Sequence, residues 1–153
     1  MKAGSALVTF VAIAGFATSA FAAEVEPKAV SFEGGSVAAP LTETPGDPAE
    51  GRKVFASRKL GNCLACHVNT EMSDQQFHGE VGPPVDGAAD RWSVEELRGI
   101  VTNAKQTFTD ETVMPGFYTL EVGKNVRKDL IGVTILTAQQ VEDVVAYLAT
   151  LKE

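Results

Sequence analysis

The sequence predicts an all-α domain with long connecting loops. Three segments show the capping patterns and apolar spacing of amphipathic helices: residues 47–60, a segment that begins at Ser93, and the end of the chain from Thr137. The stretches between them show little periodicity. The chain has 153 residues, which is enough for one domain of this kind.

Asp47-Pro48-Ala49-Glu50 marks the start of the first expected helix. Aspartate is a favoured N-cap, proline suits the first helical position, and an acidic residue three positions after the cap completes the pattern. The helix is expected to continue through Gly51 and Phe55 towards Leu60. Glycine inside a helix lowers helix stability by about 1 kcal/mol relative to alanine. Gly51 is therefore expected to have a structural role.

Two further helices are expected downstream. One starts at Ser93, where Glu96 completes a capping box, and its apolar residues are Val94, Leu97, Ile100, Val101 and Ala104. The last starts with the capping box Thr137-Ala138-Gln139-Gln140, and its apolar residues are Val141, Val144, Val145, Leu148 and Leu151. Glu142, Asp143 and Lys152 are expected on or near its solvent-facing side.

Residues 1–22 resemble a cleavable signal peptide. Lys2 is followed by an apolar run too short to span a bilayer, and Ala20-Phe21-Ala22 has the small-x-small pattern of a cleavage site. We therefore expect an exported, periplasmic protein with a signal peptide over 1–22, an extended arm over 23–46 and a helical domain over 47–153, without a membrane anchor after cleavage.

The charge of the chain excludes some classes of partner. The formal net charge is −7, and removal of residues 1–22 takes away one lysine and no acidic residue, which leaves −8. An acidic surface without a basic stripe argues against nucleic acid and anionic lipid as partners.

Cys63-Leu64-Ala65-Cys66-His67 is the Cys-x-x-Cys-His signature of covalent haem c attachment. On a helical turn, residues three apart share a face, so both sulfurs can form thioethers with one haem. His67 then projects towards the iron as the proximal ligand. The sequence predicts one covalently bound haem c.

Three other interpretations of the two cysteines are weaker. A thioredoxin-like motif needs a βαβ context, and no such unit is visible here. A structural zinc site needs four ligands, and His78 lies eleven residues after His67, outside the usual finger spacing. A plain disulfide leaves His67 unexplained.

The order of helix, haem motif, loop, helix, long loop and terminal helix is typical of a small monohaem cytochrome c. In that fold the first and last helices pack together. Gly51 would permit their close approach, and Phe55 could pack on Tyr147.

A second axial iron ligand is needed for electron transfer at a six-coordinate haem. Met72 follows His67 by only five residues, whereas Met114 follows after an intervening helix and lies in the rigid sequence Met114-Pro115-Gly116. Met114 is therefore the preferred ligand, with Met72 and His78 as alternatives and core filling as the plainer role of any methionine.

Gly82-Pro83-Pro84 follows the haem motif at the place where a proline carbonyl can accept the Nδ1–H of the haem histidine. Pro83 is the candidate for this role. The plainer interpretation is an ordinary polyproline-like loop.

Four stretches together resemble the SoxX family, the monohaem subunits of the SoxAX cytochromes of bacterial thiosulfate oxidation. They are Gly61-Asn62-Cys63-Leu64-Ala65-Cys66-His67, Gly82-Pro83-Pro84, Met114-Pro115-Gly116-Phe117-Tyr118 and the terminal-helix stretch 135–148. The haem motif is shared by all c-type cytochromes, so the last two stretches carry the narrower resemblance.

The resemblance implies a periplasmic heterodimer with the haem-bearing subunit SoxA, acting as an L-cysteine S-thiosulfotransferase. That complex couples thiosulfate oxidatively to a cysteine of the carrier protein SoxYZ, and the electrons pass to a small soluble cytochrome c. This chain would be the electron-transfer subunit and not itself catalytic. Both of its cysteines are used as thioethers, so no thiol remains for sulfur transfer.

Two other functions remain open: a freestanding electron carrier, and a gas sensor or peroxidase with an open iron. Residues 24–46 and 116–136 exceed what a minimal cytochrome needs, and long loops in compact domains are often functional. Our hypothesis is that both segments contribute to a partner interface, while plain solvated loops remain the simpler alternative.

Overall fold

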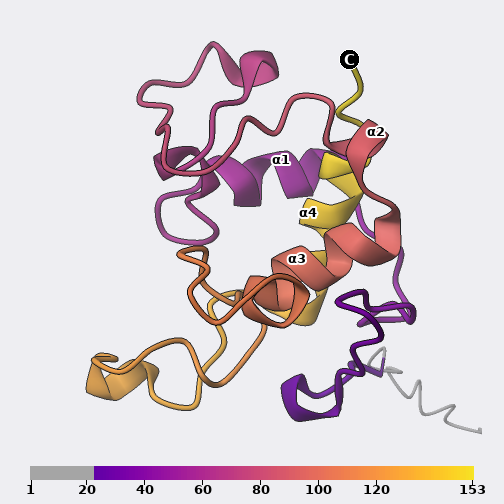
Figure 1. The fold of residues 1–153 in the computed structure, drawn as a ribbon, viewed down its shortest axis with the longest axis vertical. Coiled ribbons are helices and arrows are strands. Elements are labelled where there is room, and N and C mark those ends of the chain that lie inside the picture. The colour runs from indigo at the N-terminus through magenta and orange to yellow at the C-terminus, as the bar shows by residue number, and fades with distance from the viewer. Residues whose placement is uncertain (1–22) are drawn as a thin grey trace, which may run out of the picture.

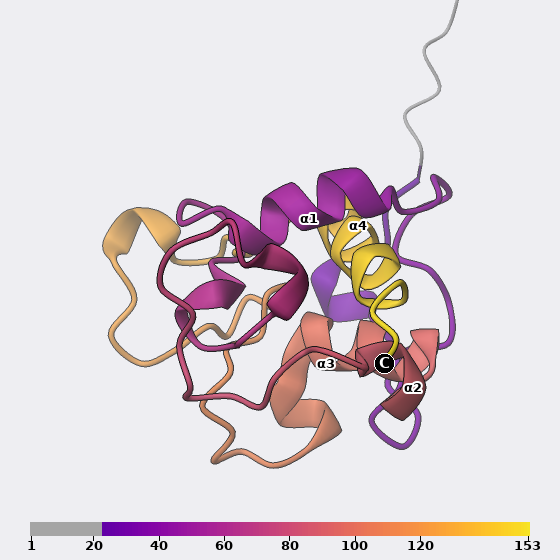
Figure 2. The ribbon, with the colours of Figure 1, turned by 90° about the horizontal axis from the view of Figure 1, so that it is seen from above.

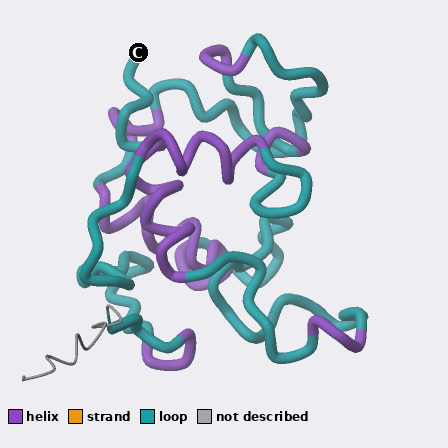
Figure 3. The backbone as a smooth tube through the Cα atoms, turned by 180° about the vertical axis from the view of Figure 1, so that it is seen from behind, coloured by secondary structure: helices purple, strands orange, loops and turns teal. Residues whose placement is uncertain are grey.

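The computed structural model describes residues 23–153, so the expected signal peptide over 1–22 lies outside the described residues. The described chain contains helices and loops, with no strand among these residues (Figures 1 and 3). The α-helices are α1 (Pro48–Ala56), α2 (Ala88–Arg91), α3 (Val94–Thr107) and α4 (Ala138–Leu148). Short 3-10 turns occur at Pro27–Ala29, Cys63–Ala65, Thr70–Met72 and Lys128–Leu130. The all-α prediction is confirmed.

Helices α1 and α4 cross closely at the centre of the molecule (Figures 1 and 2). A Cβ atom added at Gly51 would lie 1.9 Å from the carbonyl oxygen of Asp143, so only glycine fits at this crossing. The rings of Phe55 and Tyr147 meet edge to face with their centroids 5.6 Å apart. Both contacts expected between the first and last helices are present.

Helix α1 begins as expected and ends earlier than expected. The Asp47 side chain caps Ala49 N–H, but Asp47 N–H donates to Asp143 Oδ1 on α4 at 2.9 Å, and not back to a glutamate in its own first turn. The helix stops at Ala56 and not near Leu60. Ser57 is extended, and its carbonyl accepts from the N–H groups of Leu60 and Asn62 in a turn that leads into the haem motif.

The expectation that Glu142 and Asp143 face solvent is wrong, since their exposed fractions are 6% and 7%. Glu142 forms a buried ion pair with Arg98 of α3, with Nε and Oε1 2.8 Å apart. A carboxylate can be buried when a charged partner and hydrogen bonds satisfy it. Periodicity alone could not reveal this, because the partner is 44 residues away.

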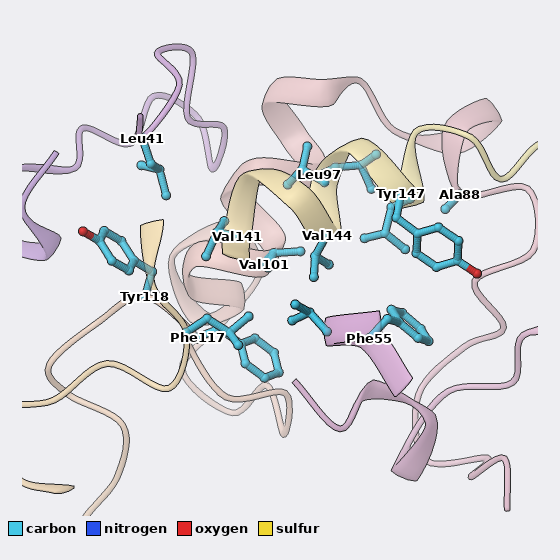
Figure 4. Packing of buried hydrophobic residues seen from close by; sticks show 14 of the residues in the cluster. Leu41, Phe55, Ala88, Leu97, Val101, Phe117, Tyr118, Val141, Val144 and Tyr147 are labelled. Carbon is cyan, nitrogen blue, oxygen red and sulfur yellow. The ribbon is translucent and has the colours of Figure 1, made fainter. Parts of the chain in front are cut away.

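Residues 23–46 are packed against the helices. Val37 and Leu41 are buried in the same apolar core as α1, α3 and α4, and Figure 4 shows Leu41 there. Leu41 N–H donates to Glu142 Oε1, and Arg98 Nη1 donates to Val37 O, at 2.8 and 2.9 Å. The buried ion pair therefore ties this segment to α3 and α4.

The core lies where α3, α4 and α1 meet (Figure 4). Its aliphatic side chains on α3 and α4 are those of Leu97, Val101, Val141, Val144, Val145 and Leu148. Val94 was expected on the apolar face of α3, but it is 42% exposed, because it occupies the first position of the helix beyond the core. The capping boxes expected at Ser93 and Thr137 are both formed.

Residues 119–136 form a loop that projects from the helices, in light orange in Figures 1 and 2. Residues 133–136 within this loop form no strand. Among the described residues, none belongs to a helix with the length and apolar character needed to cross a bilayer.

Candidate haem site

The Cys-x-x-Cys-His sequence forms a tight turn directly after α1. Cys63–Ala65 is one turn of 3-10 helix, and the N–H groups of Cys66 and His67 both donate to Cys63 O, at 3.0 and 2.9 Å. Asn62 enters the turn in the left-handed conformation with φ 50°. Both cysteines and the histidine are partly buried. The turn therefore brings three potential haem-binding groups to one place.

Cys63 is poorly suited to thiolate chemistry. Burial raises the pKa of the Cys63 thiol to about 12, so this group stays protonated near neutral pH. Reactive dithiol motifs depend on the opposite shift, a lowered pKa. Within residues 23–153, no cluster of three or more His, Cys, Asp and Glu side chains is arranged to hold a metal ion. The zinc and thioredoxin-like interpretations thus find no support in the described part of the chain.

Gly82-Pro83-Pro84, which we call the proline loop, runs along the imidazole of His67. His67 Nδ1 lies 2.7 Å from Pro83 O, which makes it the proton-bearing nitrogen and leaves Nε2 free to bind a metal. A Cβ added at Gly82 would lie 2.4 Å from the ring carbon Cε1, so glycine is required for this approach. Sequence reasoning singled out Pro83 but missed the part played by Gly82.

An apolar cavity of about 550 Å³ opens beside this turn. Cys63, Cys66 and His67 line it, together with Pro83 and Met114. The remaining wall comes mainly from apolar side chains of the helices and the long loop, among them Phe55, Leu97, Ile100, Val101, Phe117 and Leu148. An apolar cavity with two thiols, an imidazole and a thioether at its wall fits a covalently attached haem in chemical character.

The three candidates for the second axial ligand occupy different places. Met114 lines the cavity and is partly buried. Met72 is fully buried in the core and does not line the cavity. His78 Nδ1 accepts from Asn69 N–H at 3.3 Å, and its Nε2 lies 3.1 Å from Met72 O, so both ring nitrogens have protein partners. Of the three, Met114 alone faces the cavity that holds His67.

A second layer of contacts fixes the proline loop, and sequence reasoning did not find it. The Arg91 guanidinium donates to the carbonyls of Pro84 and Asp86 at 2.9 and 2.6 Å. Asp86 Oδ1 accepts from the backbone N–H of Thr70 at 2.9 Å and from its hydroxyl. The Thr70 hydroxyl, with the backbone bond, holds the pKa of the Asp86 carboxyl below its usual value.

The chain was compared with known proteins. The family model for cytochrome c matches residues 48–152. Among solved structures, a chain of SoxXA from P. pantotrophus is 46% identical, with a TM-score of 0.80, and the match covers 86% of this chain and 100% of that chain. Among proteins with curated descriptions, none matches significantly. The chain belongs to the cytochrome c family, and with it come a covalently bound haem c and electron-transfer chemistry.

Proposed function

We propose that this chain is the electron-transfer subunit of a SoxAX-type complex that couples thiosulfate oxidatively to a cysteine of a SoxYZ carrier protein. The observation that carries the proposal is the 46% identity with a chain of SoxXA over the full length of that chain. The match includes far more than the haem motif, which all c-type cytochromes share.

At the site, Cys63 and Cys66 would attach the haem, and His67 and Met114 would bind its iron. The haem supplies reversible one-electron chemistry at its iron. The Pro83 carbonyl accepts the Nδ1–H of His67, which orients the ring and makes it a stronger donor to the iron. A methionine thioether bound together with the imidazole would raise the reduction potential and would leave no site on the iron for exogenous ligands.

These proposed haem-binding residues imply that electron transfer and sulfur chemistry occur on different subunits. With both cysteines in thioether bonds, the chain has no thiol that could accept sulfur. With Met114 bound, the iron has no open position for thiosulfate. The sulfur–sulfur bond therefore forms on the partner SoxA and the carrier SoxYZ, and this chain receives electrons and passes them to a small soluble cytochrome c. The complex works in the periplasm, to which residues 1–22 direct the chain.

We assign the contact with SoxA to the projecting loop and not to the N-terminal arm. Leu130, Ile131, Val133 and Ile135 expose between 37% and 68% of their surface on this loop. By contrast, the arm buries Val37 and Leu41 in the core, so much of its apolar surface is already used within the chain.

The test is affinity purification of the tagged chain from its native periplasm, followed by haem staining of the separated polypeptides. We expect a second, stoichiometric haem-bearing chain. A single haem-staining band that runs alone at low salt would contradict the proposal and favour a freestanding electron carrier.

A further inference from the structure

The segment that carries Met114 is held by the C-terminal part of α3. This helix departs from helical geometry at Asn103, where φ is −158° and ψ is 93°. Just before this kink, the carbonyl of Val101 accepts from Phe117 N–H at 3.3 Å, and that of Thr102 accepts from Tyr118 N–H at 3.0 Å. Carbonyls that a continuous helix would use internally thus hold the chain that follows Met114.

The chain that precedes Met114 is held from the other side of the kink. Lys105 Nζ donates to Asp110 O at 3.2 Å and to Thr112 O. Thr112 N–H in turn donates to Thr109 O at 3.0 Å, which closes a short turn that ends two residues before Met114. The Lys105 backbone N–H donates to Asn103 Oδ1 at 3.2 Å, so the kink itself sets where the lysine side chain starts.

Met114 therefore sits between two anchored points of an otherwise irregular loop. Its thioether is a neutral and weak iron ligand, so the time it spends on the iron depends on how well the loop is preorganised. Lys105 is the only side chain on α3 that the described structure shows bonded to the carbonyls before Met114.

We propose that Lys105 is a positioning residue that holds Met114 on the haem iron. This inference rests on the proposed function, because it takes Met114 to be the second axial ligand. Loss of the ammonium group frees the carbonyls of Asp110 and Thr112 and lets the loop move away from the cavity. In the absence of another ligand, the Met114 sulfur still binds the iron most of the time.

The experiment measures carbon monoxide binding to the reduced, full-length haem protein, together with the sulfur-to-iron charge-transfer band of the oxidised form. Carbon monoxide enters only when the methionine leaves the iron. In Lys105→Met, which keeps the length of the side chain, we expect the band to persist and binding to be about tenfold faster, the factor that corresponds to the loss of about 1.4 kcal/mol of hydrogen bonding to a charged group.

Two matched variants separate the contact from general effects. Lys105→Arg keeps a cationic donor and should bind carbon monoxide at nearly the wild-type rate. Lys28→Met removes an exposed lysine of the N-terminal segment, away from the haem cavity and the projecting loop, and should leave the rate unchanged. A rate in Lys105→Met equal to that of the wild type would overturn the role of Lys105.

If Met114 is not the iron ligand, the variants give a different set of results. Met114→Ala should abolish the charge-transfer band and make carbon monoxide binding fast. Adding Lys105→Met to Met114→Ala should then cause no further acceleration, because the lysine acts only through the methionine. A band that survives in Met114→Ala would show that Met114 is not the ligand, whatever Lys105 does.

Discussion

Asp86 joins the chain segment that follows His67 to the loop that contains Pro83. Its carboxylate accepts two hydrogen bonds from Thr70, and its backbone carbonyl accepts from Arg91. The hydrogen bonds from Thr70 favour the ionised carboxylate, which is why the pKa of Asp86 is lowered. A single residue thus links the segment that follows His67 to the loop that holds its ring.

We expect Asp86→Asn to lower the free energy of unfolding at pH 7 by less than about 1 kcal/mol, because the group is partly exposed and water screens it. A carboxyl with a lowered folded-state pKa stabilises the fold above its unfolded pKa of about 4, and this contribution disappears as pH falls through the folded value. The difference between wild type and variant should therefore shrink as the pH falls below about 4.

Chemical denaturation of the haem-loaded protein across this pH range measures the difference. Glu43→Gln changes another exposed carboxylate, away from the haem site, and should have a smaller effect. If the difference for Asp86→Asn were the same at low and neutral pH, the carboxylate would not be the stabilising form.

Among individual residues, the sequence predicted those whose role follows from their neighbours along the chain. It missed those whose role depends on contacts that form only in the folded protein. Cys63, Cys66 and His67 follow from one pentapeptide. Pro83 and Met114 were named from their position along the chain, and both lie at the cavity. Gly82 and Lys105 have no local signal, because the His67 ring and the Thr112 carbonyl reach them only in the folded chain.

Among the helices, the crossing of α1 and α4 is the contact most sensitive to a single methyl group. Two effects of Gly51→Ala oppose each other. Alanine favours the helix by about 1 kcal/mol over glycine. However, its Cβ would lie 1.9 Å from Asp143 O and 2.8 Å from Tyr147 Cβ, which forces the two helices apart.

We expect the overlap to prevail, with a net loss of about 1–3 kcal/mol in the free energy of unfolding, typical of an overpacked core. Gly123→Ala is the matched control, because an added Cβ there meets no atom closer than 4.0 Å. Denaturant titration of both variants measures the effect. A Gly51→Ala protein at least as stable as wild type would mean that the helices can separate at little cost.

The helices also show which structural features the sequence pattern predicts and which it does not. Capping signals located the starts of α1, α3 and α4, because capping depends on side chains a few residues apart. The end of α1 was not predicted, since it depends on the reversal needed to place the haem turn. The burial of Glu142 was not predicted either, because its partners Arg98 and Leu41 come from distant segments.

For the whole molecule, the buried ion pair explains why residues 23–46 belong with the helices. Arg98 and Glu142 together bind the backbone of Val37 and Leu41, and those two side chains fill the core beside α3 and α4. A deletion of this segment would leave the pair without its backbone partners and expose apolar surface. The arm thus stabilises the haem domain, and its removal would be a poor test of partner binding.

The projecting loop is the better test of how the molecule assembles. Ile131 and Val133 are 68% and 50% exposed, on a loop that extends beyond the helices (Figure 1). Apolar side chains exposed together commonly mark protein interfaces, where their burial stabilises the complex. A charge placed there would have to be desolvated on docking.

We expect Ile131→Asp with Val133→Asp to abolish co-purification of the haem-bearing partner while haem content and the free energy of unfolding stay near wild type. Val94→Asp is the matched control. Val94 is also exposed, at 42%, but it lies at the start of α3, where an acidic residue is favourable to the helix. Equal recovery of the partner with the loop variant and with Val94→Asp would place the interface elsewhere, whereas loss with the loop variant alone would locate it on residues 128–135.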